Sequence, residues 1–538
     1  MQNSKSSIIY SFFIGAILLT CVLASFSLTA EAPVVRALWP AIIALVLTLL
    51  TRQAIVGLLF GALAGVLFLT EGNVFQAVTT LTENHFFPAF SGSWHIGAIL
   101  FTLILGAFAL VIEKSGGFET LANRLLGKQQ RDPQRSLEAS TAGLGLLCFF
   151  DGLANSLLIG RITKPLADKL SVPRARLAYI VDSTSSSVAC IAFISTWIAT
   201  QLSLIEQAIQ PYSRVKDSAY QLFFQSVPNN FYCLFTLIFL ALVIIRKWNI
   251  GPMKRAKAVP LSALRQNSKS SVITPVRVAI IPIIILSLAI LTLFYTWETV
   301  TLFPITGAKL SDAFSGNAGP YALTLGALIG LFAACLFFPR SKRAELPEAV
   351  KSGVSSMLQP VLLLVLAWTF GSVISELGTG QWVASALGTH FPVHYLPAAI
   401  FVTGAAMALV TGSSWGTMAL LMPIAIPAYL DLAGDEITLL PAAIAAVFSG
   451  AVFGDHCSPF SDTTIVSAFA CGVSPQEHVM TQLPYALIAA STALVLGFVP
   501  IAHGLPPVFA ILGGTLFLII LTLVATRAKK VSSTPATE

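Results

Sequence analysis

The most constraining feature of the sequence is a polar stretch between two long apolar segments, GDHCSPFSDTT at residues 454–464. The flanks are typical of membrane helix, yet the stretch contains Asp455 and Asp462. A carboxylate at bilayer depth costs about 2.5–3.5 kcal/mol even on a lenient scale, so two of them indicate a function. Gly454 and Pro459 are predicted to break the helix. Backbone groups freed at that depth are tolerated only where they line a cavity, so the stretch predicts a transporter with a cation site in a broken helix.

The composition supports a polytopic membrane protein. Of 538 residues, 56% are hydrophobic and only 10% are charged, whereas soluble domains carry about 25% charged residues. The net charge of +7 does not indicate nucleic acid, because the basic residues lie in short loops between apolar segments, as the positive-inside rule requires. The partners expected are therefore the lipid bilayer and a transported solute.

Neither an enzyme nor a cofactor site is indicated. The seven cysteines have no metal-ligand spacing and predict neither zinc nor a disulfide framework. Cys457 is interpreted as a small buried residue. No Walker A or H-E-x-x-H motif is present, which argues against a primary pump or a zinc protease.

Apolar segments near spanning length recur along the chain and predict about twelve transmembrane helices. They are 8–30, 37–51, 53–70, 94–113, 177–200, 226–246, 277–297, 321–338, 353–375, 438–470, 482–502 and 506–526.

The orientation follows from charge. The segment from Arg246 to Arg277 carries eight Lys or Arg residues and no Asp or Glu, so it is predicted to be cytoplasmic. The span at 8–30 is followed by Ala30-Glu31-Ala32, which resembles a cleavage site. A retained first helix is favoured, with a signal peptide at 1–32 as the alternative. With the first helix retained, both termini are cytoplasmic.

Two further segments are predicted to be re-entrant hairpins. Residues 137–160 lie between two basic segments, so both ends favour the cytoplasm, and the polar break Asp151-Gly152-Leu153-Ala154-Asn155 forms the tip. Residues 393–430 are interrupted at 411–416 and end at acidic Asp431, which predicts a hairpin from the opposite side. Each hairpin precedes a polar-interrupted crossing, as in an inverted repeat of an alternating-access transporter.

The interruption of the first-half crossing is predicted at residues 182–187, continuing to Ser195 and Thr196. Residues 190–195 (CIAFIS) can be aligned with 456–461 (HCSPFS). Phe193 then stands where the second half has Pro459, so the first-half break is expected to be gentler.

Candidate ion and substrate ligands come from all four interruptions. Sodium prefers hard oxygen ligands, and the same carboxylates could carry protons; the candidate Na⁺ ligands are Asp455, Asp462 and Ser461. The further candidates are Asp182, Asp151, Asn155, Ser183, Thr184, Thr411, Gly412, Ser413, Ser414, His456, Ser458 and Thr463.

Structural alternatives stay open for each group. Asp455 and Asp462 could be helix N-caps, and His456 could be a satisfied donor rather than a proton carrier. Asp151 and Asn155 could form an exposed turn. The serine run at 182–187 could bond only the preceding helical turn. Residues 411–416 could be a packing turn or, with a helix N-terminus from Thr417 onward, an anion site.

The 454–464 stretch, together with Thr411-Gly412-Ser413-Ser414-Trp415-Gly416-Thr417, resembles the NhaC-type Na⁺/H⁺ antiporter family over residues 90 to 505. The resemblance implies secondary transport across a bacterial inner membrane. It also implies relatives that move organic anions or amino acids. Related architectures are often homodimers, which is an expectation by analogy.

The expected fold class is an all-α polytopic membrane protein with about twelve transmembrane helices and two re-entrant hairpins in an inverted repeat. The predicted divisions are 1–92 (N-terminal helices), 93–246 (first repeat), 247–276 (basic loop), 277–352 (connecting helices), 353–505 (second repeat) and 506–538 (C-terminal helix and tail). The leading function is Na⁺/H⁺ antiport; the alternative is Na⁺-coupled symport or exchange of a small carboxylate or amino acid. A channel or a membrane scaffold is poorly supported, because neither needs inverted repeats.

Overall fold

The computed structural model describes residues 33–126, 132–259, 274–298, 303, 309, 313, 318–388 and 391–532. Within these ranges the chain is helical, with no strand. Ten helices are long and apolar enough to cross a membrane, or up to twelve if each bent pair is one span. The expected all-α polytopic fold is confirmed. The predicted crossing at 8–30 and the 1–32 cleavage question lie outside the described residues.

The helices outside the two hairpins and their broken helices have the following bounds: α2 Pro33–Thr51, α3 Ala54–Leu69, α4 Val74–Thr80, η1 Leu81–Phe86, η2 Phe87–Phe90, α5 Ser93–Ser115, α6 Gly117–Leu126, α13 Arg277–Glu298, α15 Gly319–Phe337, η6 Arg340–Glu345, α16 Leu346–Ser356, α17 Leu358–Glu376 and α18 Thr379–Leu387.

The elements of the two repeats and of the C-terminal region are α7 Pro133–Leu147, α8 Gly152–Lys169, α9 Arg174–Ile191, α10 Thr196–Ile209, α11 Ala219–Ser226, η3 Val227–Asn229, α12 Phe231–Arg246, η4 Gly251–Arg255, η8 Val393–Tyr395, α19 Leu396–Thr411, α20 Ser414–Ala433, α21 Leu440–Cys457, α22 Asp462–Cys471, α23 Pro475–Thr492, η9 Ala493–Phe498, α24 Val499–Ala502 and α25 Pro507–Ser532.

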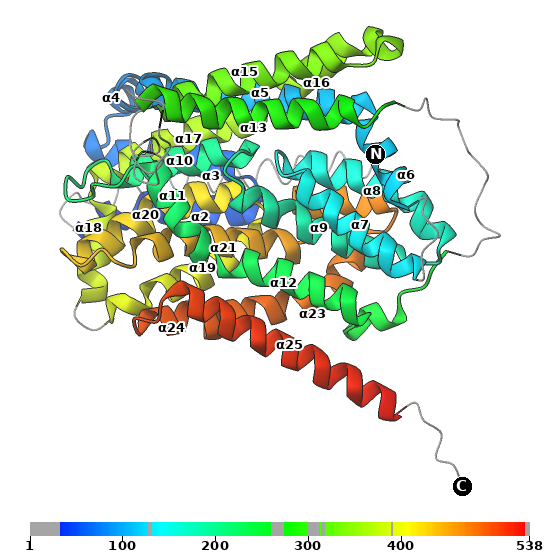
Figure 1. Ribbon diagram of the computed structural model, residues 1–538. Coiled ribbons are helices and arrows are strands. Elements are labelled where there is room, and N and C mark those ends of the chain that lie inside the picture. Colours follow the sequence, from blue (N-terminus) through cyan, green and yellow to red (C-terminus); the bar gives the residue numbers. More distant parts are fainter. Residues whose placement is uncertain are drawn as a thin grey trace, which may run out of the picture.

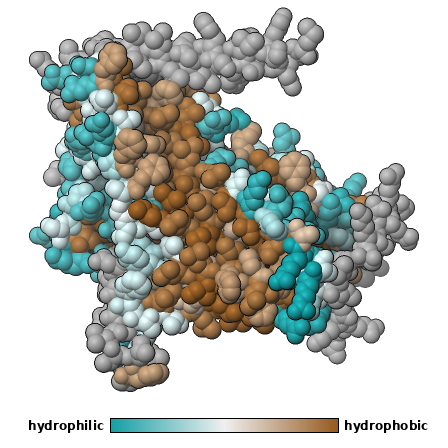
Figure 2. Space-filling model, turned by 90° about the horizontal axis from the view of Figure 1, so that it is seen from above, coloured by the Kyte–Doolittle hydropathy of each residue, from teal (hydrophilic) through white to brown (hydrophobic). Residues whose placement is uncertain are grey.

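The surface formed by α13 and α15 fits a lipid environment. Its large apolar side chains are exposed, among them Ile284, Leu288, Leu325 and Phe332. Figure 2 shows a broad hydrophobic band with more hydrophilic residues at its two ends. An exposed apolar area of this kind is typical of a surface covered by lipid.

The long helices lie roughly side by side and end at two faces (Figure 1). We call one the basic face; it carries the start of α9 at Arg174 and the end of α12 at Arg246. The end of α25 belongs to it, because the Arg246 guanidinium donates to Thr526 Oγ1 (3.1 Å). The opposite face carries the end of α10 and the loop between α20 and α21, where the Tyr212 hydroxyl donates to Asp431 Oδ2 (2.9 Å).

The second hairpin, α19–α20, enters from the opposite face. Helix α19 runs parallel to α21: Gly404 faces Gly450, Ala408 faces Gly454, and Gly412 at the tip contacts Phe460. Helix α20 then returns to the face from which α21 begins. The predicted hairpin at 393–430 is therefore present, and its tip lies beside the break between α21 and α22.

The first hairpin, α7–α8, enters from the basic face. Glu138 pairs with Arg176 (2.9 Å) near that face, and Gly145 contacts Thr184 closer to the tip, so α7 runs parallel to α9. At the tip, the Thr196 backbone N–H donates to the Phe150 carbonyl (2.9 Å). The predicted hairpin at 137–160 therefore abuts the break between α9 and α10.

Each hairpin packs on the broken helix of the other repeat at the centre of the protein. Helix α8 of the first hairpin packs on α22, where Ser467 Oγ donates to Ser156 Oγ (3.0 Å) and Gly160 contacts Ala470. Helix α20 of the second hairpin packs on α10, where the rings of Trp197 and Trp415 lie 5.8 Å apart. The two hairpins thus enter from opposite faces and meet at the centre, as an inverted repeat requires.

The two breaks occupy residues 192–195 and 458–461, which confirms the alignment of 190–195 with 456–461. Three details differ from prediction. The break in the first crossing is not at 182–187, which stay helical. The first break is not gentler, because α9 and α10 are bent by 43° whereas α21 and α22 together form one span, Leu440–Cys471. Gly454 does not break α21, because it lies inside the helix where α19 packs.

Gly454 sets how closely α19 approaches α21. A Cβ at this position would come within 2.6 Å of the Ala408 backbone, and overpacking of this kind costs about 1–3 kcal/mol. We expect Gly454→Ala to lower the apparent unfolding temperature of the detergent-solubilised protein. Gly513→Ala on α25, where a Cβ meets nothing within 4 Å, serves as the control. An unchanged temperature for Gly454→Ala would show that this packing is not tight.

Candidate functional site

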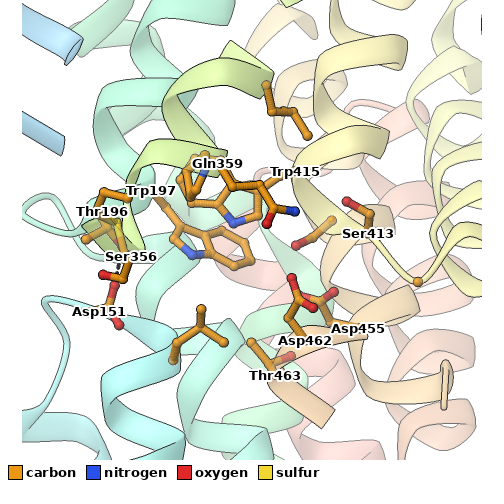
Figure 3. Close-up of a pocket in the computed structure, with 16 residues that line it drawn as sticks. Asp151, Thr196, Trp197, Ser356, Gln359, Ser413, Trp415, Asp455, Asp462 and Thr463 are labelled. Carbon is orange, nitrogen blue, oxygen red and sulfur yellow. Dashed lines mark hydrogen bonds between the residues drawn. The ribbon is translucent and has the colours of Figure 1, made fainter. Parts of the chain in front are cut away.

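Four helices begin at one central cavity. Helices α8, α10, α20 and α22 start at Gly152, Thr196, Ser414 and Asp462, directly after the two hairpin tips and the two breaks. The cavity has a volume of about 130 Å³ (Figure 3). Its lining residues are Asp151, Leu153, Thr196, Trp197, Ser356, Met357, Gln359, Pro360, Leu363, Gly412, Ser413, Ser414, Trp415, Asp455, Asp462 and Thr463.

The helix starts give the cavity a positive field. Each helix N-terminus has unpaired N–H groups and carries about half a positive elementary charge. Asp151, Asp455 and Asp462 face the same space, so the carboxylates oppose four positive helix ends. The balance between these charges depends on how many of the three carboxylates bind a proton or a cation.

Asp455 is the most deeply buried carboxylate of the cavity wall, with 2% of its surface exposed. Its Oδ1 accepts a hydrogen bond from Ser461 Oγ (3.0 Å), and Ser461 Oγ also lies 3.2 Å from Thr463 Oγ1. Among the described residues, Asp455 Oδ2 has no hydrogen-bond partner. A buried carboxylate oxygen without a partner is costly, and a proton or a cation at this oxygen would remove that cost.

Asp462 and Asp151 occupy different environments. Asp462 is the first residue of α22 and is exposed to the cavity, beside Asp455 in Figure 3. Asp151 is 4% exposed and caps α8, since its Oδ1 accepts from the Ala154 N–H (2.6 Å). Its Oδ2 accepts from Thr196 Oγ1 (2.9 Å). Asp151 is therefore satisfied by donors, whereas Asp462 is open to a solute.

The remaining wall comes from the turn between α16 and α17 and from two tryptophans. Ser356, Met357, Gln359 and Pro360 stand at the turn between α16 and α17. Trp197 and Trp415 contribute their indole rings. The cavity thus combines charged groups with an aromatic, partly apolar wall, as small-molecule sites usually do.

A second, drier centre surrounds Asp182 behind the cavity wall. Asp182 is fully buried, and its carboxylate accepts from Gln482 Nε2 (2.7 Å) and Ser467 Oγ (3.2 Å). Thr464 Oγ1 donates to the same carboxylate (3.4 Å). His478 Nε2 lies 3.2 Å from Asp182 Oδ2. Since these donors come from α22 and α23, Asp182 ties both helices to α9.

The comparison with known sequences identifies the family. A sequence profile of the Na⁺/H⁺ antiporter family matches residues 188–501, more than half of the chain. The chain belongs to the Na⁺/H⁺ antiporter family. The match covers the first break with α10, the second hairpin and the second broken helix, and the resemblance to NhaC-type antiporters is confirmed.

Relatives of this antiporter family member include an uncharacterized protein of Haemophilus influenzae, 31% identical over 482 residues, covering 86% of this chain and 89% of that protein. The malate-2H⁺/Na⁺-lactate antiporter of Bacillus subtilis is 31% identical over 168 residues, covering 29% of this chain and 33% of that protein. A further Haemophilus influenzae protein, an uncharacterized Na⁺/H⁺ antiporter, is 29% identical over 158 residues, covering 28% and 33%. The chain is therefore a membrane transporter rather than a member of an enzyme family.

Two solved structures share the fold. The YdaH transporter of Alcanivorax borkumensis superposes with a TM-score of 0.54 at 17% identity, covering 78% of this chain and 89% of that one. MtrF of Neisseria gonorrhoeae gives the same TM-score and identity, covering 79% and 84%. At this identity the likeness shows the fold alone.

Seven of the predicted site residues line the cavity: Asp151, Gly412, Ser413, Ser414, Asp455, Asp462 and Thr463. Two structural alternatives do not hold. Asp151 is buried rather than in an exposed turn, and Asp455 lies inside α21 rather than at an N-cap. The helix N-terminus of the second hairpin begins at Ser414, not at Thr417, because the Ser413 side chain caps it by accepting from the Gly416 N–H (3.0 Å).

The other predicted residues lie near the cavity without lining it. Thr184 bonds the preceding helical turn through the Ile180 carbonyl (3.0 Å), as the structural alternative for the serine run requires. Asn155 Nδ2 donates to the Gly145 carbonyl (2.8 Å), which closes the first hairpin. His456 Nδ1 lies 2.8 Å from the Tyr232 hydroxyl, away from Asp462. The remaining members of this group are Asp182, Ser183, Thr411, Ser458 and Ser461.

Sequence reasoning missed His478 and Gln482. They are four residues apart on α23, so they share one helix face. A histidine and a glutamine on one face of an otherwise apolar crossing are unusual, since polar side chains inside a membrane helix are expensive. That spacing was a usable signal, whereas their partner Asp182 lies about 300 residues away and could not be paired from the sequence.

The two carboxylate centres should respond differently to removal of charge. Asp182→Asn places an amide beside Gln482 and His478, and breaking a buried polar cluster costs about 3–5 kcal/mol. Asp462→Asn changes a carboxylate open to the cavity. We expect the apparent unfolding temperature to fall clearly for Asp182→Asn and to stay near wild type for Asp462→Asn. The opposite order would show that Asp182 is not the structural centre.

Proposed function

We propose that this family member exchanges Na⁺ for H⁺ at the central cavity, with Asp455 and Asp462 binding the two cations alternately. One observation supports this most: Asp455 is a buried carboxylate with one oxygen lacking a partner among the described residues, beside a second carboxylate open to the cavity. Sodium is a hard cation, and Asp455, Asp462, Ser461 and Thr463 offer oxygen ligands in one place.

The exchange follows from competition for the same oxygens. A proton on Asp455 removes its negative charge and lowers its value as a sodium ligand, and bound sodium disfavours protonation. Only one of the two cations then occupies the site at a time. The protein therefore carries Na⁺ across the membrane in one direction and H⁺ in the other. Opposed hairpins and two broken helices suit access from alternate faces.

A second candidate function is exchange of a small organic carboxylate. Four helix N-termini at one cavity favour an anion once the carboxylates carry protons or sodium. The Bacillus subtilis relative is named as a malate-2H⁺/Na⁺-lactate antiporter. In this scheme Ser413, Ser414 and the start of α20 bind the carboxylate, and the cation sites set the coupling.

We further propose that the protein lies in the bacterial inner membrane with the basic face in the cytoplasm. That face carries Arg174, Arg246 and the end of α25, so the positive-inside rule supports a cytoplasmic C-terminus.

The first test is sodium-triggered proton movement in proteoliposomes, read with a pH-sensitive dye. We expect wild type to release protons when sodium is added. Asp455→Asn and Asp462→Asn should weaken exchange by roughly tenfold or more, since a charged ligand contributes about 1.5–3 kcal/mol. Asp435→Asn, in the exposed loop after α20, is the matched control. Wild-type vesicles that show no sodium-proton exchange would end this proposal.

The second test is uptake of labelled malate or lactate into the same vesicles under a proton or sodium gradient. Exchange of a carboxylate predicts saturable uptake that is stimulated by unlabelled solute on the far side. Replacing Ser414 with Val should reduce this uptake more than it reduces sodium-proton exchange. Sodium-proton exchange that is complete without any carboxylate, and no uptake of either acid, would leave Na⁺/H⁺ antiport alone.

A further inference from the structure

A second cavity lies toward the opposite face. Its volume is about 420 Å³, and its lining residues are His85, Pro88, Ala89, Ser91, Gly92, Ser93, Trp94, His95, Glu206, Gln207, Gln210, Trp368 and Ser372. Two helices contribute to both cavities. Thr196 of α10 and Leu363 of α17 line the central one, whereas Gln207 of α10 and Trp368 of α17 line the outer one. The α10–α17 seam therefore connects the two.

A polar stripe follows this seam along α10. Thr196, Thr200, Ser203 and Gln207 are spaced by four, three and four residues, so they lie on one face of the helix. At a rise of 1.5 Å per residue, the stripe from Thr196 to Gln207 is about 16 Å long. It begins at the central cavity and ends at the outer cavity.

The middle of the stripe is dry and unsatisfied. Thr200 is 0% exposed and Ser203 is 1% exposed. Thr200 Oγ1, Ser203 Oγ and Gln207 Oε1 have no hydrogen-bond partner among the described residues. Threonine and serine in membrane helices usually bond the preceding turn, as Thr102 of α5 does with Ala98. Consecutive unpaired polar atoms on one face therefore need another explanation.

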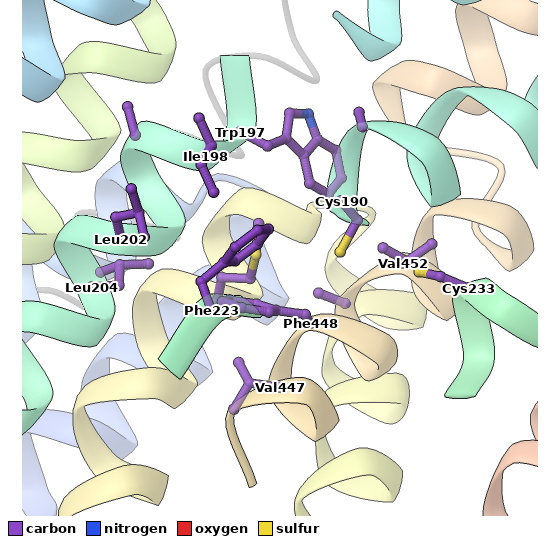
Figure 4. Packing of buried hydrophobic residues seen from close by; sticks show 14 of the residues in the cluster. Cys190, Trp197, Ile198, Leu202, Leu204, Phe223, Cys233, Val447, Phe448 and Val452 are labelled. Atoms are coloured by element: carbon purple, nitrogen blue, oxygen red, sulfur yellow. The ribbon is translucent and has the colours of Figure 1, made fainter. Parts of the chain in front are cut away.

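The rest of α10 behaves as ordinary core. Ile198, Leu202 and Ile205 lie on the other side of the helix and are 0% exposed. Figure 4 shows Ile198, Leu202 and Leu204 of α10 in the buried cluster that also contains Phe223 of α11 and Phe448 of α21. Gln201 is an exception: it is fully buried off the stripe, its Nε2 donates to the Cys190 carbonyl (3.0 Å), and its Oε1 also lacks a partner among the described residues. What distinguishes the seam face is its row of unpaired hydroxyls.

Both ends of the stripe meet groups that bind protons. At the inner end, Thr196 Oγ1 donates to the Asp151 carboxylate (2.9 Å). At the outer end, Glu206, His85 and His95 line the cavity, and the carboxylate of Glu376 lies 3.6 Å from His85. The indole of Trp368 stacks on His95 with ring centroids 4.1 Å apart, and Gln207 Nε2 donates to the Trp368 carbonyl (2.7 Å).

We propose that the α10–α17 seam is the proton route between the opposite face and the central cavity, which rests on the proposed proton-coupled transport. A hydroxyl both donates and accepts, so a proton entering from Glu206 or water at the outer cavity can be passed through bridging water along the stripe. It ends on Asp151, and each hydroxyl regains the proton that it gives up. Thr200 and Ser203 in the middle of the stripe are fully buried, so the route suits protons and single waters rather than hydrated sodium.

The first experiment removes the hydroxyl groups at constant shape. Thr200→Val and Ser203→Ala are expected to slow sodium-proton exchange severalfold in proteoliposomes. Because each change removes a buried polar atom without a partner, the apparent unfolding temperature should stay constant or rise. Thr236→Val on α12, whose buried hydroxyl likewise has no partner among the described residues, is the control and should keep the wild-type rate.

These variants separate the two proposals. Wild-type exchange with full rates in Thr200→Val and Ser203→Ala would overturn the route while leaving Na⁺/H⁺ antiport intact. A loss of rate accompanied by an equal loss in Thr236→Val would also overturn it, because the effect would then be general.

The second experiment needs no transport. In D₂O, Ser203→Cys should exchange its thiol proton for deuterium, read from the S–D infrared stretch, and Ile205→Cys on the apolar face of the same helix should not. The wild-type protein gives the deuteration of the native cysteines. Selective deuteration of Ser203→Cys supports a water route even if sodium-proton exchange fails for wild type, which would overturn the antiport proposal alone. Equal deuteration of both variants, or of neither, would contradict the route.

Discussion

The structure depends on bringing four helix N-termini to one point inside an apolar protein. Helices α8, α10, α20 and α22 all begin at the central cavity, and unpaired N–H groups at that depth are costly without a counter-charge. The three carboxylates supply it. This explains why Asp151, Asp455 and Asp462 are tolerated inside a membrane protein. It also couples the charge state of these carboxylates to any ion or solute that enters the cavity.

Two carboxylate centres therefore have different physical roles. Around the cavity, Asp455 keeps an oxygen without a partner and Asp462 is open to solute. The Asp182 carboxylate, in contrast, accepts hydrogen bonds from donors on α22 and α23. A satisfied buried carboxylate holds helices together, and an unsatisfied one can bind a cation. The two centres thus differ in how their carboxylates are hydrogen-bonded rather than in depth, and the proposed transport role belongs to the centre with the unsatisfied oxygen.

Much of this arrangement could be predicted from the sequence, because charge, hydropathy and helix breakers act locally. The two hairpins, both broken crossings and the alignment of 190–195 with 456–461 required only these signals. The seam, the Asp182 partners and the Trp197–Trp415 contact required long-range pairing, which one sequence does not contain. Asp182 shows the limit: the sequence predicts it at the interruption of the first-half crossing, yet it lies inside α9, and the alignment makes Thr196 the counterpart of Asp462. The role of Gly454 was also misjudged, because a glycine in a helix can serve a break or a close contact, and only the position of Ala408 decides between them.

The distribution of tight contacts indicates which parts can move together. Each hairpin is held on its own broken helix by glycine contacts, with Gly145 against Thr184 in the first half and Gly454 against Ala408 in the second. Close packing of this kind resists sliding, because small displacements produce overlap. The α10–α17 seam has one such contact, Gly371 against the Gln207 side chain, but cavities flank the seam at both ends and hydroxyls occupy its middle. A relative displacement there loses little apolar contact. We therefore expect alternating access to occur by movement of the hairpin–helix units as rigid bodies against α5 and α17. The central cavity lies where these units meet.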